Sequence, residues 1–187
     1  RLKVIAGTGA NSTKEAIELT RRARDAGADG TLQVTPYYNK PNQEGLYRHF
    51  SSVADLGLPV VLYNIPGRTG RGIDLPTVYR LAKHPHIAAV KEAAGDVDRV
   101  RAIVNNTDLT VVSGDDPLTL PMMVVGAQGV ISVASNVVPG AVADMVHAAM
   151  QGDWATARTI HLRHHQRCNE MFLVTNPIPV KAAMGMM

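Results

Sequence analysis

Short apolar runs alternate with amphipathic segments along the whole chain. Each run is about five residues long and rich in β-branched side chains, and successive runs begin about 20–29 residues apart. Runs of this length, separated by segments with helical periodicity, predict a repeated strand–helix unit. The six predicted strands are Leu2–Ala6, Thr31–Thr35, Pro59–Tyr63, Ile87–Lys91, Leu109–Ser113 and Gly129–Val133.

The segments between the runs carry signals for helix starts and stops. Ser12 and Glu15 have the spacing of a capping box, and Gly27 is suited to end that helix. Polar residues of the kind that cap helices also precede the later apolar stripes. They open predicted helices at Asn42 or Gln43, Asp74, Asp96 and Asp116-Pro117, and further helices are predicted over Pro139–Met150, Asp153–Phe172 and Val180–Met187.

Repeated strand–helix units predict a parallel sheet, either doubly wound or closed as a (β/α)₈ barrel. A doubly wound nucleotide-binding fold needs a glycine-rich phosphate loop, and Gly7-Thr8-Gly9 lacks the third glycine of that motif. The barrel is favoured because reactive side chains follow several strands, where barrels keep their sites. We find no linker, so residues 1–187 are read as one α/β TIM-barrel domain. It has about six βα units, with the first two units and the C-terminal helical part absent.

Composition narrows the function classes. The chain is 45% hydrophobic and 19% charged, typical of a globular protein. The single cysteine, Cys168, excludes an internal disulfide and makes the cytoplasm the expected compartment. A net charge of +3 with only 4% aromatic residues does not favour nucleic-acid binding. No apolar run reaches the ~18 residues of a membrane span, so we expect no membrane association.

One of the six lysines stands out by its position. Lys91 alone ends an uninterrupted apolar run, Ile87-Ala88-Ala89-Val90. Burial lowers the pKa of a lysine and leaves a free amine that can attack a carbonyl. The alternative is that Lys91 leaves the strand and pairs with Glu92 in solvent.

Tyrosines at neighbouring strand ends favour the Schiff-base interpretation. Tyr37, Tyr38 and Tyr63 all follow apolar runs, and a positioned phenol can move protons to and from a carbinolamine. Arg68 lies in a segment rich in Gly and Pro, where a guanidinium can hold a carboxylate by two hydrogen bonds. The alternatives are aromatic packing for the tyrosines and a solvated loop position for Arg68.

Five motifs in one order carry a resemblance to a known family. They are Thr35–Pro41, Tyr63–Gly70, Val90–Ala93, Ser113–Asp116 and Gly129–Val133, and the likeness runs from Val4 to Lys181. Together they resemble the dihydrodipicolinate synthases of the dihydrodipicolinate synthase / N-acetylneuraminate lyase superfamily. The resemblance implies a (β/α)₈ barrel whose Schiff-base lysine is on the sixth strand. Lys91 ends the fourth run here, which fits the absence of two preceding strands.

The resemblance also implies roles for single residues. Lys91 would form an imine with pyruvate, with Tyr63 as proton donor and acceptor beside it, and Arg68 would bind the carboxylate of L-aspartate 4-semialdehyde. Gly114 and Ile131 would line the pyruvate pocket. The product would be 4-hydroxy-tetrahydrodipicolinate, in lysine and diaminopimelate biosynthesis, with no cofactor and no metal.

Regulation and assembly follow from the same resemblance. Tyr38 would reach a neighbouring subunit's site in a homo-oligomer, expected as a tetramer built from two dimers, while Tyr37 packs at the contact. Asn11, Glu15 and Tyr37 match part of a site for L-lysine as inhibitor. The family's proton relay also needs threonines from a Gly-Thr-Thr-Gly-Glu-type loop. This sequence has no such loop, so we expect this chain to lack part of the relay.

Two rival functions remain open at this point. A pyruvate-dependent sugar-acid aldolase of the same superfamily shares the lysine and tyrosine, but such lyases generally lack an arginine at position 68. A non-catalytic protein could instead bind phosphate or nucleotide at the helix start after Gly7-Thr8-Gly9.

A possible zinc set lies on one predicted helix face. Its members are His161, His164, His165 and Cys168. No carboxylate completes it, so we interpret it as a polar or subunit-facing helix surface. Asp115-Asp116-Pro117 is likewise interpreted as a helix cap.

Overall fold

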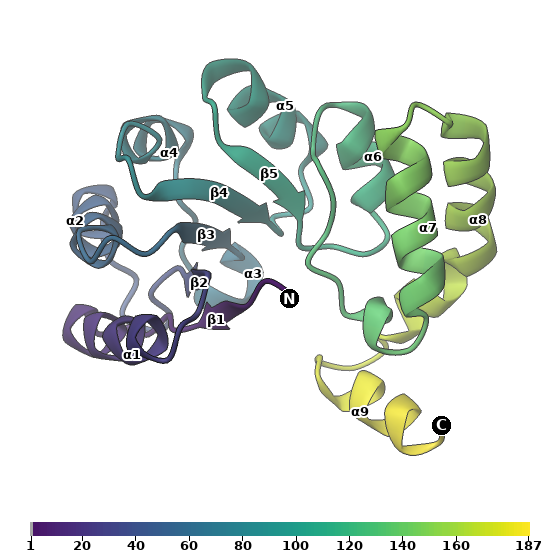
Figure 1. The fold of residues 1–187 in the computed structure, drawn as a ribbon, viewed down its shortest axis with the longest axis horizontal. Helices are drawn as coiled ribbons and strands as arrows, with labels where there is room; N and C mark the ends of the chain where they lie inside the picture. The colour runs from purple at the N-terminus through teal and green to yellow at the C-terminus, as the bar shows by residue number, and fades with distance from the viewer. Residues whose placement is uncertain (1) are drawn as a thin grey trace. The chain divides into compact units, whose positions relative to one another are not determined.

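The computed structural model describes residues 2–187 and divides them into two compact units (Figure 1). The first unit ends at Val111 and the second begins at Val112. Within residues 2–187, no helix is both long enough and apolar enough to cross a membrane.

Parallel strands and the helices between them build the first unit. Sequence neighbours are also neighbours in the sheet, whose order is β1-β2-β3-β4-β5, and the pairings from β1 to β4 are parallel. The strands within this unit are β1 (Ile5–Gly7), β2 (Gly30–Val34), β3 (Val60–Asn64) and β4 (Ile87–Glu92), while β5 (Thr110–Ser113) spans the boundary between the two units. The helices are α1 (Thr13–Asp25), α2 (Gln43–Ala54), α3 (Pro66–Thr69), α4 (Leu75–Leu81) and α5 (Val97–Asn106).

The longer helices of this unit pack side by side along one face of the sheet, α1 on α2, α2 on α4, and α4 on α5 (Figure 1). Leu46, Phe50 and Val53 recur at helical spacing on α2 and are fully buried. Gln33 of β2 identifies the helix-covered face, because its side-chain amide lies 3.0 Å from the Thr20 hydroxyl of α1. Side chains alternate along a strand, so the residues on either side of Gln33 in β2 belong to the opposite face of the sheet.

Three of the predicted helix caps are confirmed by hydrogen bonds. The side chains of Ser12, Asn42 and Asp96 accept the backbone N–H three residues later, at 3.4, 2.8 and 3.1 Å. Gly27 follows α1 with φ of +84°, the left-handed conformation that glycine adopts without strain. Asp74 precedes α4 as predicted, but its side chain makes no capping bond.

The second unit is mainly helical. It contains α6 (Thr119–Val124), a 3₁₀ turn η1 (Ala134–Asn136), α7 (Pro139–Met150), α8 (Trp154–Glu170) and α9 (Ile178–Gly185). Helices α7 and α8 pack along each other, and both contact α6. Asp153 caps α8 through the Thr156 N–H at 3.0 Å, which confirms the predicted start of that helix.

Two predictions in this unit are corrected by the structure, and the carboxylate of Asp116 bears on both. In the predicted cap Asp115-Asp116-Pro117, the Asp115 side chain accepts the Leu118 N–H at 3.2 Å. The buried carboxylate of Asp116 instead accepts the N–H groups of Val133 and Ala134 at 2.9 and 3.0 Å. Helix α6 begins only at Thr119. The run Gly129–Val133 forms no strand. It makes a single bridge, Ser113 to Val130, before the chain turns into η1.

Other predicted boundaries shift by one to three residues. Strand β1 begins at Ile5 rather than at Leu2, a residue that is 89% exposed. The segment around Arg68, read as a loop, contains the single helical turn α3, because Pro66 at its first position has a fixed helical φ. Helix α9 begins at Ile178, ahead of the expected Val180.

His49 is a buried histidine on α2 with one unsatisfied nitrogen. Its Nδ1 lies 2.9 Å from the Thr13 hydroxyl, its ring meets Phe50 edge-on, and its Nε2 has no partner. Burial lowers the pKa of His49 to about 4. The fold therefore holds this imidazole neutral where the unfolded chain would protonate it.

We predict an acid-sensitive stability contribution from His49. The folded-state pKa is below the unfolded value of about 6.5, so the contribution is complete above pH 6.5. It should decline toward pH 4, by about 3 kcal/mol in all. Urea unfolding at pH 4.5–7 should show a steeper pH slope for the wild type than for His49→Gln. The exposed-histidine control His147→Gln should keep the wild-type slope, and equal slopes in all three would contradict the prediction.

Candidate active site

The register of β3 with β4 places Tyr63 beside Lys91. The two residues are paired across the parallel ladder, so their side chains share one face. The Lys91 Nζ lies 4.0 Å from the centre of the Tyr63 ring. Both belong to the face opposite the helices, at the carboxyl ends of their strands. An amine and a phenol are thereby brought together as the sequence predicts.

Burial distinguishes Lys91 from a solvated surface lysine. The residue is 9% exposed and Glu92 is fully buried, so an ion pair between the two in solvent is ruled out. Burial also raises the pKa of the Tyr63 phenol, and the Arg68 charge partly offsets that rise. The phenol therefore keeps its proton at neutral pH and can donate it to a group beside Lys91.

Arg68 lies on α3, the short turn that follows β3. The turn is closed by hydrogen bonds from the N–H groups of Arg68 and Thr69 to the Ile65 carbonyl, at 3.0 and 3.1 Å. Arg68 is exposed, and its charge is felt at the Tyr63 phenol. A guanidinium held on a turn beside this phenol is suited to bind the carboxylate of a molecule that reacts there.

Tyr38 has an unusual backbone conformation after β2. Its φ is +71°, which a residue with a side chain rarely adopts, and the Asn39 N–H donates to the Tyr37 carbonyl across it at 2.9 Å. The Tyr38 residue is 89% exposed and Tyr37 is 43% exposed. Tyr38 therefore projects away from the described part of its own chain, whereas Tyr37 is partly packed against it.

The segments that carry Tyr38 and Arg68 approach each other closely through Lys40 and Gly70. A Cβ on Gly70 would lie 2.8 Å from the Lys40 Cε, so the lysine stem packs against the bare glycine backbone. Gly70 also has φ of +71° and ends α3 in the left-handed conformation. The backbone conformation favours glycine here, while the contact involves only the flexible end of the Lys40 side chain.

Gly114 and Ile131, expected at a pyruvate pocket, belong to the second unit. Gly114 directly follows β5, and the Ile131 N–H donates to the Ser113 carbonyl at 2.9 Å. The carboxylate of Asp116 fixes the residues that follow Ile131. These bonds bring the two predicted residues to either side of Ser113 within that unit.

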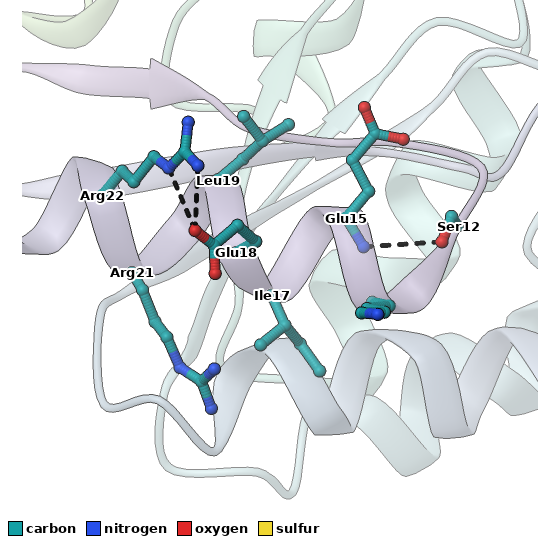
Figure 2. A pocket seen from close by; sticks show the side chains of 8 residues that line it. Ser12, Glu15, Ile17, Glu18, Leu19, Arg21 and Arg22 are labelled. Carbon is teal, nitrogen blue, oxygen red and sulfur yellow. Dashed lines mark hydrogen bonds and ion pairs between the residues drawn. The ribbon is translucent and has the colours of Figure 1, made fainter.

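The expected inhibitor residues form a partial cluster. The Asn11 side chain donates to the Tyr37 carbonyl at 3.2 Å, and the Asn39 side chain donates to the Asn11 carbonyl at 2.9 Å. Glu15 lies one turn into α1, along a hollow of ≈ 820 Å³ (Figure 2). The lining residues come from α1 and its cap alone: Ser12, Lys14, Glu15, Ile17, Glu18, Leu19, Arg21 and Arg22. The hollow is thus a surface groove with mixed charges.

The histidine–cysteine face of α8 is a packed surface. His161, His164 and Cys168 border a small gap beside α7 with Asp116, while His165 is exposed. Burial, together with nearby aspartates, raises the pKa of the Cys168 thiol to about 11, so the sulfur is protonated and a poor ligand. In the described part of the chain, no three His, Cys, Asp or Glu side chains are placed to hold a metal ion.

The glycine-rich segment after β1 has a packing role. A Cβ on Gly9 would lie 2.5 Å from the Val34 nitrogen, so glycine allows two backbones to touch. Thr8 is buried in a hydroxyl cluster with Thr20 and Thr31. Both observations argue against a phosphate cradle at this position.

Three residues that matter to the site were missed from the sequence. Asn64, Glu92 and Arg99 form a buried hydrogen-bonded group on the helix-covered face, directly behind Tyr63 and Lys91. A signal was available, because Asn64 and Glu92 follow Tyr63 and Lys91 at equivalent positions of adjacent predicted strands. A polar residue there, on the face that packs against helices, requires a buried partner.

Comparison with known proteins settles the family. The model of the dihydrodipicolinate synthetase family matches residues 1–187. The chain belongs to this family. The resemblance seen in the sequence motifs is confirmed.

Named relatives support the same assignment to the dihydrodipicolinate synthetase family. The 4-hydroxy-tetrahydrodipicolinate synthase of Geobacter sulfurreducens is 54% identical over 190 residues, covering 100% of this chain and 66% of the relative. Dihydrodipicolinate synthase from Aquifex aeolicus superposes with a TM-score of 0.97 at 50% identity, over 99% of this chain and 64% of that one.

Two further structures of the family hold small molecules. The Acinetobacter baumannii enzyme, complexed with pyruvate, matches with a TM-score of 0.97 at 47% identity, over 100% of this chain and 65% of that one. The Cyanidioschyzon merolae enzyme, with lysine bound, matches with a TM-score of 0.95 at 44% identity, over 98% and 64%. The likenesses confirm the predicted α/β TIM-barrel class. The chain spans 64–66% of the length of these relatives.

Proposed function

We propose that the protein carrying this chain condenses pyruvate with L-aspartate 4-semialdehyde to give 4-hydroxy-tetrahydrodipicolinate, by a Schiff base on Lys91. The observation that carries the proposal is the buried Lys91 amine beside the Tyr63 phenol, at the carboxyl ends of paired strands. Family membership and the pyruvate complex of a relative support the choice of pyruvate.

The first half of the reaction joins pyruvate to the enzyme. The neutral Lys91 amine adds to the ketone carbon, and the Tyr63 phenol supplies a proton as the carbinolamine loses water. Loss of a proton from the pyruvate methyl group then gives an enamine. The raised pKa of Tyr63 keeps the phenol protonated for the dehydration step.

The second half uses the nucleophilic carbon of this enamine. That carbon attacks the aldehyde of the second substrate, whose carboxylate is held by Arg68. The amino group of the same substrate then adds to the imine carbon, which closes the ring and frees Lys91. The positive charge on α3, next to the phenol, favours an aldehyde that carries a carboxylate.

We extend the proposal to assembly, regulation and location. Tyr38 completes the site of a second copy in a homo-oligomer, a tetramer of two dimers, and its 89% exposure supports this role. L-Lysine binds near Asn11, Glu15 and Tyr37 as an inhibitor, supported by the lysine-bound relative. The lone cysteine supports a cytoplasmic location. The residues expected at the pyruvate pocket are Gly114 and Ile131.

Pyruvate should form a reducible adduct on Lys91. The complete protein is incubated with pyruvate and borohydride, and the modified peptide is mapped by mass spectrometry. Lys83→Arg should keep the label, because that exposed residue lies outside the site, whereas Lys91→Arg should lose it. A label on another lysine, or no label, would end the Schiff-base assignment.

Truncation of Arg68 should separate the two half-reactions. Arg68→Ala should leave the pyruvate adduct intact but slow the condensation by about 2–4 kcal/mol, the range for removing one partner of a hydrogen-bonded charge pair. Arg71→Ala on the following turn serves as the matched control. For the wild type and both variants, steady-state rates with the semialdehyde measure the condensation, and yields of the reduced pyruvate adduct measure the first half-reaction. An unimpaired Arg68→Ala enzyme would instead favour the sugar-acid aldolase.

Mixed oligomers should reveal whether Tyr38 serves a neighbouring subunit. Tyr38→Phe and Lys91→Ala proteins, each expected to be inactive, are combined under conditions of verified subunit exchange. A site with the Lys91 of one copy and the Tyr38 of the other should then recover activity. In the control, Tyr47→Phe is used in place of Tyr38→Phe, which shows the effect of removing a tyrosine hydroxyl at another position. Mixtures that stay inactive would mean that Tyr38 has no role across an interface.

A further inference from the structure

A second polar pair lies directly behind Tyr63 and Lys91. Asn64 follows Tyr63 and Glu92 follows Lys91, and these two are also partners in the β3–β4 register. Consecutive strand residues point to opposite faces, so Asn64 and Glu92 face the helices. Asn64 is 2% exposed and Glu92 is fully buried.

Hydrogen bonds join this pair into a closed ring with Arg99 and Ile73. The Asn64 amide donates to the Glu92 Oε1 at 2.8 Å, and the Arg99 Nε donates to the Glu92 Oε2 at 2.8 Å. The Arg99 Nη2 donates to the Ile73 carbonyl, and the Ile73 N–H returns to the Asn64 Oδ1 at 3.0 Å. Every bond in this ring includes a side chain that is buried or nearly so.

The buried charge of Glu92 is fully compensated within this ring. Its carboxylate also accepts the Ala94 N–H at 2.9 Å, so both oxygens are occupied. Arg99 is fixed in turn, since it lies in the first turn of α5 and its N–H donates to the Asp96 cap. A buried ion pair satisfied in this way gives one geometry and makes alternatives costly.

The ring closes the base of the segment that carries Arg68. That segment leaves the sheet after Asn64 and runs to Ile73, just before α4, and both end residues belong to the ring. Within the segment, the Thr69 hydroxyl donates to the Ile65 carbonyl at 3.0 Å. Gln43 of α2 supports its far end, because the Gln43 amide donates to the Gly72 carbonyl and accepts the Asp74 N–H, both at 3.0 Å. The ring therefore ties both ends of the Arg68 segment to the strand that carries Lys91, and Gln43 adds a second support at the far end.

We propose that Asn64, Glu92 and Arg99 are positioning residues that fix the Arg68 segment relative to the Tyr63–Lys91 pair, and so set the affinity for the carboxylate of the second substrate. This inference rests on the proposed function. None of the three touches the substrate. They act through the backbone of the 65–72 segment, on the face of the sheet opposite the chemistry.

The substitution Arg99→Lys tests the proposal, because it keeps the positive charge beside Glu92 but removes the guanidinium group. A lysine has no planar fork to bridge the Glu92 carboxylate and the Ile73 carbonyl together. The KM for the semialdehyde should rise about 10- to 100-fold, the scale of a small misplacement of a binding group. The kcat and the KM for pyruvate should stay within about twofold. The control is Arg101→Lys on the same helix, whose ion pair with Asp98 is exposed.

A double-mutant cycle separates positioning from general loss of structure. If Arg99 acts through Arg68, then adding Arg99→Lys to Arg68→Ala should change the semialdehyde KM by less than about twofold. A full additional loss in the double variant would overturn the proposal. So would equal losses for pyruvate and the semialdehyde in Arg99→Lys alone.

Limited trypsin digestion gives a readout that needs no activity. Cleavage after Arg68 and Arg71 should be faster in Arg99→Lys and in Glu92→Gln, while cleavage after Arg80 within α4 reports global unfolding. Unchanged cleavage at Arg68 and Arg71, relative to Arg80, would overturn the positioning role. Absence of a pyruvate adduct in the wild type would instead refute the proposed function, with the digestion result still decisive for the ring.

Discussion

The in-register parallel pairing of β3 with β4 is the constraint on which the site depends. One ladder step pairs Tyr63 with Lys91, and the next pairs Asn64 with Glu92. Because side chains alternate, these two steps supply both a reactive pair on one face and a buried polar pair on the other. A slip of one residue would exchange the faces. It would bury the amine among helices and expose the carboxylate where the substrate should bind.

This arrangement lets the sheet serve two electrostatic purposes without conflict. A phenol that keeps its proton beside an amine needs a partly desolvated setting, and burial raises the pKa of Tyr63 next to Lys91. A carboxylate on the same face would favour the charged form of the amine. Glu92 lies instead on the other face, where Arg99 neutralises it. Strand β4 thus presents the Lys91 amine on one face and the charge-compensated Glu92 carboxylate on the other.

Much of this architecture could be predicted from local pattern, and the failures share a cause. Apolar runs and caps such as Asn42 and Asp96 depend on neighbours within a few residues, so they were predictable. Lys91 was found because it is the one lysine that ends such a run. Asp116 was misread as a cap because its real partners, Val133 and Ala134, are distant in sequence.

The same limit applies to the residues of the site itself. Glu92 and Arg99 are only seven residues apart in sequence. Whether they form a buried ion pair depends on which face of β4 the helices cover, and tertiary packing decides that. The positive φ of Tyr38 had no sequence signal, since such conformations are normally marked by glycine or asparagine. Properties imposed by the assembled sheet are therefore not visible in a local pattern.

The contact between Lys40 and Gly70 has a consequence for how this sequence can change over time. The stem of Lys40 occupies the space that a side chain at position 70 would need. A larger residue at position 70 would have to adopt the left-handed conformation and displace the flexible end of the Lys40 side chain. The backbone conformation thus restricts position 70 more than the contact does, because the exposed Lys40 side chain can move aside while the left-handed turn cannot.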